Sequence, residues 1–180
     1  MHEDLREVLF SREAIQNRVK ELGEEISRDF AGEKVVLVGI LKGAVLFLSD
    51  LARALDLDAR MDFMAISSYG ASTKTSGVVR FLKDLEYDVS GENVIVVEDI
   101  IDSGKSLSFL KQNLIARGVK DLKVCVLLDK PSRREVWVDV DYRGFTIPDE
   151  FVVGYGLDYA EKYRNLPYIG ILKPEIYTNV

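Results

Sequence analysis

The chain has 180 residues, of which 47% are hydrophobic and 30% are charged, and its formal net charge is −6. This length and apolar content suffice for one folded domain with a full hydrophobic core. The negative charge argues against a nucleic-acid surface, which usually requires a basic stripe. No apolar run approaches the roughly 20 residues that a membrane span needs, so we expect a cytoplasmic protein with neither membrane nor nucleic-acid partners.

The first predicted element is an amphipathic helix. Apolar residues recur at helical spacing from Ile15 to Ile26, after a possible N-cap at Ser11 and before Gly32. Strand and helix signals then alternate: strand 34–40, helix 43–55, strands 59–66, 78–82 and 93–98, helix 106–117 and strand 123–128. This rhythm predicts an α/β fold, with a mainly parallel twisted sheet flanked by helices.

After residue 128 the pattern becomes aromatic and irregular, with turn signals at 131–132, 142–144 and 148–149. We expect this part to form a small hood over the sheet edge, together with the N-terminal segment. The chain is then one domain over residues 1–180, with a core at about 30–130 and a hood that includes about 131–180. Cys125 is the single cysteine, which excludes a disulfide within the chain and argues against zinc. It lies in an apolar run.

The most informative segment covers residues 94–107. Four consecutive aliphatic residues, 94–97, indicate a strand buried on both faces, and two carboxylates, Glu98 and Asp99, follow them directly. In open α/β sheets the carboxyl ends of the strands form the edge where ligands bind. The acidic pair is therefore expected at a binding edge.

A small, hydroxyl-rich loop follows the acidic pair and enters the predicted helix. Its free backbone N–H groups suit a phosphate dianion. The two carboxylates would repel that phosphate, so they suit ribose hydroxyls or a hydrated Mg²⁺, and Asp102 is left as a candidate base. A lone loop of this kind is as often an acidic helix cap, but the strand and the three carboxylates together favour a phosphorylated sugar. The loop residues are Ser103, Gly104, Lys105 and Ser106.

This segment resembles the phosphoribosyl pyrophosphate (PRPP) binding motif of the type I phosphoribosyltransferases. Residues from about 9 to 172 resemble the hypoxanthine-guanine branch of that family. The resemblance implies purine salvage: Mg²⁺-dependent transfer of the 5-phosphoribosyl group to N9 of hypoxanthine or guanine, giving IMP or GMP and pyrophosphate. It implies that Asp102 accepts the base proton, that Glu98, Asp99 and residues 102–106 bind PRPP, and that the enzyme is a homodimer or homotetramer.

Two further segments match the family. Leu41, Lys42 and Gly43 follow a predicted strand, and alone they indicate an ordinary turn more often than a site. The resemblance makes them a pyrophosphate loop with a strained or cis Leu41–Lys42 peptide, and it aligns Arg164 with an arginine that contacts pyrophosphate. Residues 67–77 are small and polar, and they indicate either a hairpin tip or a mobile lid. The resemblance implies a closing lid with Ser68 and Tyr69 at its tip.

The hood is expected to recognise the base. Read alone, Phe151 and Val152 are more typical of a core, and Lys130 of a solvated strand end. The resemblance implies instead that Phe151 stacks on the purine, that Val152 offers backbone contacts and that Lys130 donates to a 6-oxo oxygen, which selects oxopurines over adenine. It also implies that Asp158 ligates a second Mg²⁺, beside a first at Glu98 and Asp99.

One departure from the family pattern is Asp129, which could pair with the neighbouring Lys130 and weaken that donor. The preference among hypoxanthine, guanine and xanthine is therefore left open. A xanthine-guanine enzyme is the nearer alternative, and a nucleotide-sensing regulator that binds RNA or DNA is the more distant one. Asp58, Asp62 and His2 receive no role.

Overall fold

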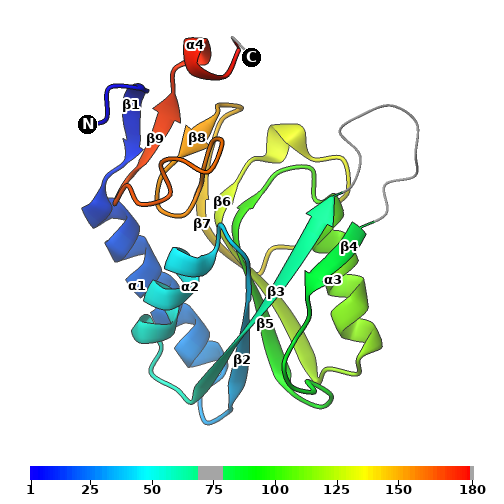
Figure 1. The fold of residues 1–180 in the computed structure, drawn as a ribbon. Coiled ribbons are helices and arrows are strands. Elements are labelled where there is room, and N and C mark those ends of the chain that lie inside the picture. Colours follow the sequence, from blue (N-terminus) through cyan, green and yellow to red (C-terminus); the bar gives the residue numbers. More distant parts are fainter. Residues whose placement is uncertain (69–78, 179–180) are drawn as a thin grey trace.

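The computed structural model describes residues 1–68 and 79–178 (Figure 1). Helices and strands alternate along most of the chain, as the sequence pattern predicts. In chain order the elements are β1 (Leu5–Phe10), α1 (Arg12–Asp29), β2 (Val35–Ile40), α2 (Val45–Ala54), β3 (Ala59–Ser68), β4 (Val79–Lys83), β5 (Asn93–Ile101), α3 (Lys105–Ala116), β6 (Asp121–Asp129), η1 (Pro131–Arg133), β7 (Tyr142–Thr146), β8 (Val152–Val153), β9 (Ile169–Leu172) and α4 (Pro174–Tyr177).

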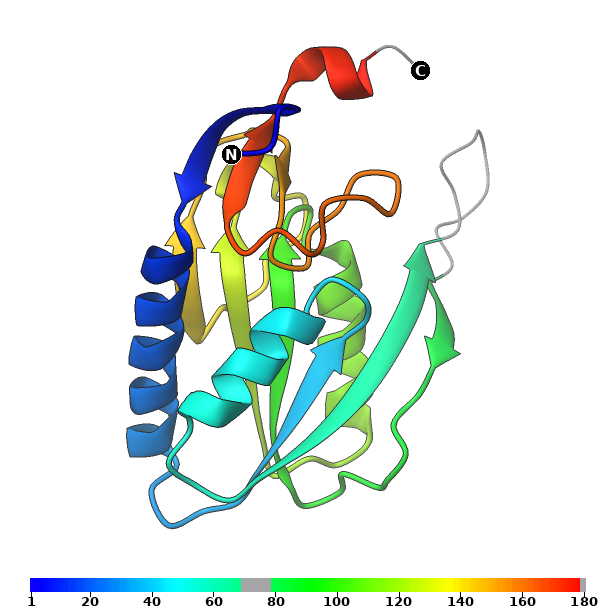
Figure 2. The ribbon, with the colours of Figure 1, turned by 60° about the vertical axis from the view of Figure 1, so that its left-hand side comes forward.

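A six-stranded sheet in the order β4-β3-β2-β5-β6-β7 forms the main layer. All neighbouring strands in it are parallel except β4, which runs antiparallel to β3. Helices α1 and α2 cover one face of the sheet and α3 covers the other (Figure 2). The predicted α/β fold with a mainly parallel, helix-flanked sheet is confirmed.

The core is built from the central strands, since every residue of β2 is buried. Leu107, Leu110 and Leu114 of α3 pack against one face of the sheet, as their spacing predicts. Helix α1 begins at the predicted cap, where the Ser11 hydroxyl accepts a hydrogen bond from the Ala14 amide at 3.2 Å. None of the helices in residues 1–68 and 79–178 is long and apolar enough to cross a membrane.

A second, three-stranded sheet in the order β1-β9-β8 forms the hood above the carboxyl ends of the main strands (Figure 1). Strand β7 does not belong to the hood, because it pairs with β6 from Cys125↔Tyr142 to Asp129↔Thr146. The main sheet therefore continues past residue 130, where we expected the core to end. The sequence does not predict β7, because this strand is short, contains Gly144 and lies among turn signals.

Strand β5 is longer than predicted. It pairs with β2 only as far as Val97, whereas it stays paired with β6 as far as Ile101. Glu98 and Asp99 therefore lie within the strand rather than after it, at the level where β2 ends. The polar side chains of Glu98 and Asp99 indicated the end of the strand. β5 nevertheless continues, because its hydrogen bonds to β6 alone are enough.

Candidate active site

The carboxylate of Asp99 lies against the loop that follows β2. A Cβ on Gly43 would lie only 1.8 Å from Oδ2 of Asp99, so only glycine fits at that position. Oδ1 of Asp99 accepts a hydrogen bond from the Ile100 amide at 2.8 Å. The acidic strand and the predicted pyrophosphate loop are thus in direct contact.

The two neighbouring carboxylates both have raised pKa values. Burial is the main cause for each, and it raises the pKa of Asp99 to about 6. Burial and the adjacent charge of Asp99 hold the pKa of Glu98 well above its usual range. The positive charge of Arg164 opposes the rise in the pKa of Asp99. A cation at this place would oppose both shifts, because its charge favours the ionised carboxylates.

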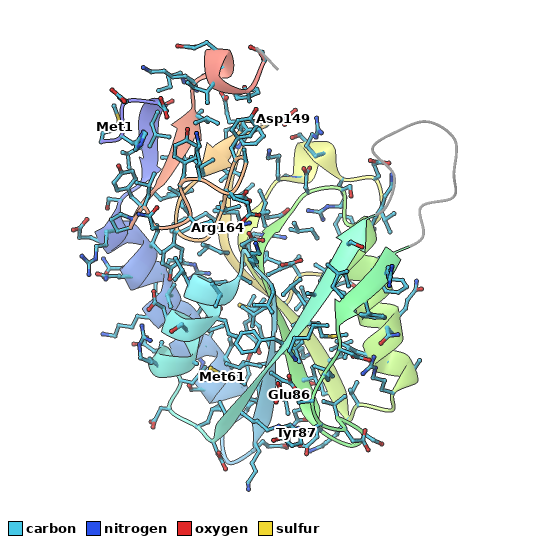
Figure 3. All side chains as sticks on the ribbon, in the orientation of Figure 1. Met1, Met61, Glu86, Tyr87, Asp149 and Arg164 are labelled. Carbon is cyan, nitrogen blue, oxygen red and sulfur yellow. The ribbon has the colours of Figure 1, made fainter. Side chains whose placement is uncertain are left out.

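The loop after β2 carries a cis peptide bond between Leu41 and Lys42, as the family resemblance implies. Nζ of Lys42 donates a hydrogen bond to Glu161 at 2.9 Å. Arg164 donates to the same carboxylate at 3.3 Å, and it lies 3.0 Å from Oδ1 of Asp158. Figure 3 shows Arg164 in the middle of the molecule, between the hood and α2. The two cations that we expected at pyrophosphate therefore meet at one acidic side chain.

Glu161 is a residue that the sequence analysis missed. Its backbone is left-handed, with a φ of 62°, and the Lys42 ammonium beside it lowers the pKa of its carboxyl group. Tyr155, Ala160 and Tyr163 also have positive φ, so the loop around it is irregular. No periodic pattern could place this carboxylate.

The phosphate loop has the geometry that its sequence predicts. Gly104 is the N-cap of α3 and has a φ of 84°, which favours glycine, and no side chain caps the helix there. The first N–H groups of α3 are therefore exposed to a ligand at that end. Oγ of Ser103 accepts a long hydrogen bond, 3.4 Å, from the Lys105 amide, whereas the ammonium of Lys105 pairs with Glu135. Ser106 is in the first turn of α3, and its side chain is partly buried.

Residues 134–136, which lie outside the predicted site, hold the phosphate loop in place. The carbonyl oxygen of Ser103 accepts hydrogen bonds from the amides of Glu135 and Val136, both at 2.9 Å. Nε of Arg134 donates to the carbonyl oxygen of Asp102 at 3.0 Å. The sequence analysis did not identify this segment, because its contacts with the loop are mostly through backbone groups.

Asp102 faces a cleft of about 260 Å³. Its Oδ1 atom is buried and accepts no hydrogen bond from the described part of the protein, and the nearest cation, Nε of Arg133, is 3.6 Å away. The cleft gathers residues from four predicted segments. They are Asp99, Ile100, Asp102, Lys130, Phe151, Val152, Leu157 and Asp158.

Lys130 is buried, with 8% of its surface exposed, although a solvated strand end was one interpretation of the sequence. Its backbone amide donates to Ile101 at 3.0 Å, and its Nζ donates to the carbonyl oxygen of Glu150 at 2.8 Å. Asp149, whose side chain is seen near the hood in Figure 3, is 3.8 Å from the same Nζ. The ammonium is thus held at the cleft, with donor capacity left for a ligand.

The expected pairing of Asp129 with Lys130 was wrong. The Asp129 carboxylate is buried and pairs instead with Arg134 at 2.5 Å and Arg143 at 2.7 Å. Lys130 follows the last residue of β6, and its Nζ binds the carbonyl oxygen of Glu150 instead. Asp129 therefore does not compete for the Lys130 ammonium.

Phe151, which lines the cleft, lies in an aromatic cluster. Its ring stacks on Tyr177 of α4 at a centroid distance of 4.8 Å, and it meets Tyr159 edge-on at 5.6 Å. Val152 is buried in β8. Tyr177 is a second residue that the sequence analysis missed, because it follows Phe151 by many residues and belongs to a helix of only one turn.

The predicted lid falls mostly outside the described residues: Tyr69 is not described, and Ser68 is described only by its backbone at the end of β3. Within residues 1–68 and 79–178, no three acidic, histidine or cysteine side chains gather as a metal cage. Mg²⁺ usually takes one or two carboxylates with water and substrate phosphates, so a hydrated ion at Asp99 needs no such cage.

Comparison with known protein families settles the assignment of the fold. The family described as the phosphoribosyl transferase domain matches residues 8–160. This chain belongs to the phosphoribosyltransferase family. The match covers β2, β5 and α3, and with them the acidic strand and the phosphate loop of this phosphoribosyltransferase.

Individual relatives place the transferase more closely. It is 51% identical, over 97% of this chain and 89% of the relative, to the hypoxanthine-guanine phosphoribosyltransferase of Mycobacterium tuberculosis. A crystal structure of a hypoxanthine phosphoribosyltransferase from Staphylococcus aureus has a TM-score of 0.95 at 49% identity, covering 99% of this chain and 97% of that one. A bifunctional TilS/HprT protein of Listeria monocytogenes is 52% identical over 99% of this chain, which spans only 28% of that longer relative.

Proposed function

We infer that this phosphoribosyltransferase transfers the 5-phosphoribosyl group of PRPP to N9 of hypoxanthine or guanine, forming IMP or GMP and pyrophosphate. The observation that carries this conclusion is the cleft of about 260 Å³. It places an acidic strand, a candidate base, a buried lysine and an aromatic ring around one space, with the convergent polar groups that a binding site requires. Its chemistry is that of sugar-phosphate and oxopurine recognition.

The sugar phosphate is held by the loop at the start of α3. Backbone N–H groups at the uncapped helix end bind the 5-phosphate, and the hydroxyls of Ser103 and Ser106 add donors. Glu98 and Asp99, in the adjoining strand, face the ribose rather than the phosphate, because like charges would repel. The reacting carbon of the sugar is thereby fixed beside Asp102.

The base lies between Phe151 and the cleft wall. Lys130 donates to the 6-oxo oxygen, and the same ammonium would meet the amino donor of adenine unfavourably. Val152 offers backbone groups to the edge of the ring. Asp102 accepts the N7 proton as the lone pair of N9 forms the bond to the anomeric carbon, and the bond from that carbon to pyrophosphate breaks.

Pyrophosphate leaves toward the loop after β2. Lys42, the backbone of Gly43 and Arg164 bring positive charge and N–H donors to that side. The residues also fit the Mg²⁺ on which this family depends, since Asp99 and Asp158 offer hard oxygen donors beside the same loop. When bound, Mg²⁺ supplies charge that stabilises the leaving pyrophosphate.

Several finer features complete the proposal. Ser68 and Tyr69 belong to a lid that excludes water from the ribosyl cation-like transition state. The enzyme acts in the cytoplasm as a homodimer or homotetramer. A single domain comprises residues 1–180, with the hood completing the base site.

The direct test is a spectrophotometric assay with PRPP and Mg²⁺ in which hypoxanthine, guanine, xanthine, adenine and uracil are offered in parallel. We expect hypoxanthine and guanine to be used and adenine to be rejected. Dominant turnover of xanthine would move the assignment to the xanthine-guanine branch. Absence of turnover with every base, while IMP still binds, would overturn the enzymatic assignment in favour of a nucleotide sensor.

A further inference from the structure

A buried ionic cluster lies directly behind the phosphate loop. The Asp129 side chain is only 5% exposed, and its two oxygens pair with different guanidinium groups. Oδ1 lies 2.5 Å from Arg134, which is 11% exposed, and Oδ2 lies 2.7 Å from Arg143, which is 49% exposed. A carboxylate buried this deeply needs such partners, because desolvation of an unpaired charge is costly.

Only one of the two arginines reaches the active site. While NH2 of Arg134 binds Asp129, its Nε donates to the carbonyl oxygen of Asp102 at 3.0 Å. Among the contacts of the described residues, the Arg143 side chain pairs with Asp129 and has none with residues 102–106. Arg134 therefore links a fixed anchor in β6 to the backbone of the candidate base.

The loop beyond Asp102 has a separate support. Ser103 is held by the amides of Glu135 and Val136, and a Cβ on Gly104 would lie 2.3 Å from the carbonyl oxygen of Val136. These contacts involve backbone atoms, so they persist when the Arg134 side chain changes. The orientation of Asp102 and the position of the phosphate loop are thus supported by different groups.

We propose that Arg134, anchored by Asp129, is a positioning residue that orients Asp102 for proton transfer. This role rests on the proposed function, because it assigns a task to the base of that reaction. Its planar guanidinium makes both hydrogen bonds at once with fixed spacing, which the single ammonium of a lysine cannot reproduce. A displacement of the base near 1 Å suffices to slow catalysis strongly.

The test compares three variants with the wild-type enzyme in the hypoxanthine assay. For Arg134→Met we expect kcat to fall about 10- to 100-fold, since misplacement costs of that order are general. KM for PRPP and Kd for IMP should stay within about twofold, because the variant is expected to lose an interaction that matters only in the transition state. A loss of binding that was equal in the ground state and the transition state would raise KM instead. Arg134→Lys should restore part of kcat, because its ammonium can make one of the two bonds.

Arg143→Met is the matched control, since it removes the other partner of the same carboxylate. It should lower the free energy of unfolding as well, although less than Arg134→Met because Arg143 is 49% exposed and Arg134 only 11%. The kcat of Arg143→Met should stay within about twofold of wild type. Equal losses of kcat in the two variants would overturn the proposal, because the charge balance of Asp129 would then explain both. Unchanged kcat in Arg134→Met would overturn it as well.

If Arg134→Met does not fold, Asp129→Asn provides the same test. The amide oxygen can still accept from Arg134, but more weakly, so kcat should fall about 3- to 10-fold with an unchanged KM for PRPP. Wild-type kcat in this variant would contradict the proposed anchor. Failure of the wild-type enzyme itself to use any base would instead reject the proposed function, so the two failures are distinguishable.

Discussion

Nζ of Lys42 donates to Oε2 of Glu161 at 2.9 Å, although the two residues are 119 positions apart in the chain. The other oxygen of this carboxylate accepts from Arg164 at 3.3 Å. One acidic side chain thus neutralises both cations assigned to the leaving group. Pyrophosphate bound there would have to displace Glu161 from them.

Glu161→Gln should therefore strengthen PRPP binding. Exposed ion pairs are weak, so we expect KM for PRPP to fall only about two- to fivefold, with little change in KM for hypoxanthine. Glu86→Gln is the control, because it removes the same charge at the opposite end of the sheet (Figure 3). The measurement is steady-state kinetics at fixed Mg²⁺ and low salt. If both variants lowered KM for PRPP equally, the change in net charge and not the position of Glu161 would be responsible.

Asp102→Asn should abolish most of kcat. The substitution keeps the size of the side chain but cannot accept the N7 proton, and general base catalysis typically supplies about 10²–10⁴-fold. KM for PRPP should change little, since the phosphate loop is held by backbone contacts. Near wild-type kcat in a purified, folded variant would disprove the role of Asp102.

Tyr177→Ala should weaken base binding. The Tyr177 ring stacks on Phe151 at 4.8 Å and 23°, and an aromatic pair of this kind contributes about 0.5–1.5 kcal/mol. KM for hypoxanthine should rise about two- to tenfold while KM for PRPP is preserved. Tyr177→Phe keeps the ring and should behave as wild type; a similar loss in that variant would point to the hydroxyl group instead of the stacked ring.

Glu33 should make the free energy of unfolding depend on pH in the acidic range. Its carboxylate accepts hydrogen bonds from Lys120 and Asn93, both at 2.6 Å, and these hold its pKa below the ordinary value of 4.5. A lowered folded pKa gives stabilisation that is present above about pH 4.5 and is lost as pH falls through the folded value. In urea titrations at several pH values, Glu33→Gln should be less stable than wild type at pH 7, and the difference should shrink in acid.

The control for this experiment is Glu24→Gln, whose carboxylate lies 3.9 Å from Lys20 on the exposed face of α1. It should leave the free energy of unfolding nearly unchanged at every pH. A difference between Glu33→Gln and wild type that stays constant across the titration would show that lost hydrogen-bond geometry, not charge, is responsible.

The sequence was most informative where one segment carries its own signal. The buried strand before Glu98 and the glycine turn at Gly104 follow from local composition, since aliphatic runs form central strands and a positive φ favours glycine. Glu161 and Arg134 could not be found in this way. Their partners, Lys42 and Asp102, lie far away in the chain, and only packing of the hood and the 133–136 segment onto the sheet brings them together.

The base side also depends on a late part of the chain. Strand β8, next to Phe151, pairs in the hood with β9, and the carbonyl oxygen of Phe151 accepts from the Leu172 amide at 2.8 Å. Helix α3, which begins at the phosphate loop, packs in a cluster that draws on no residue beyond Val140. During synthesis, which proceeds from the N-terminus, the surface for the sugar phosphate can fold first. The pocket for the base is complete only after β9 has emerged from the ribosome.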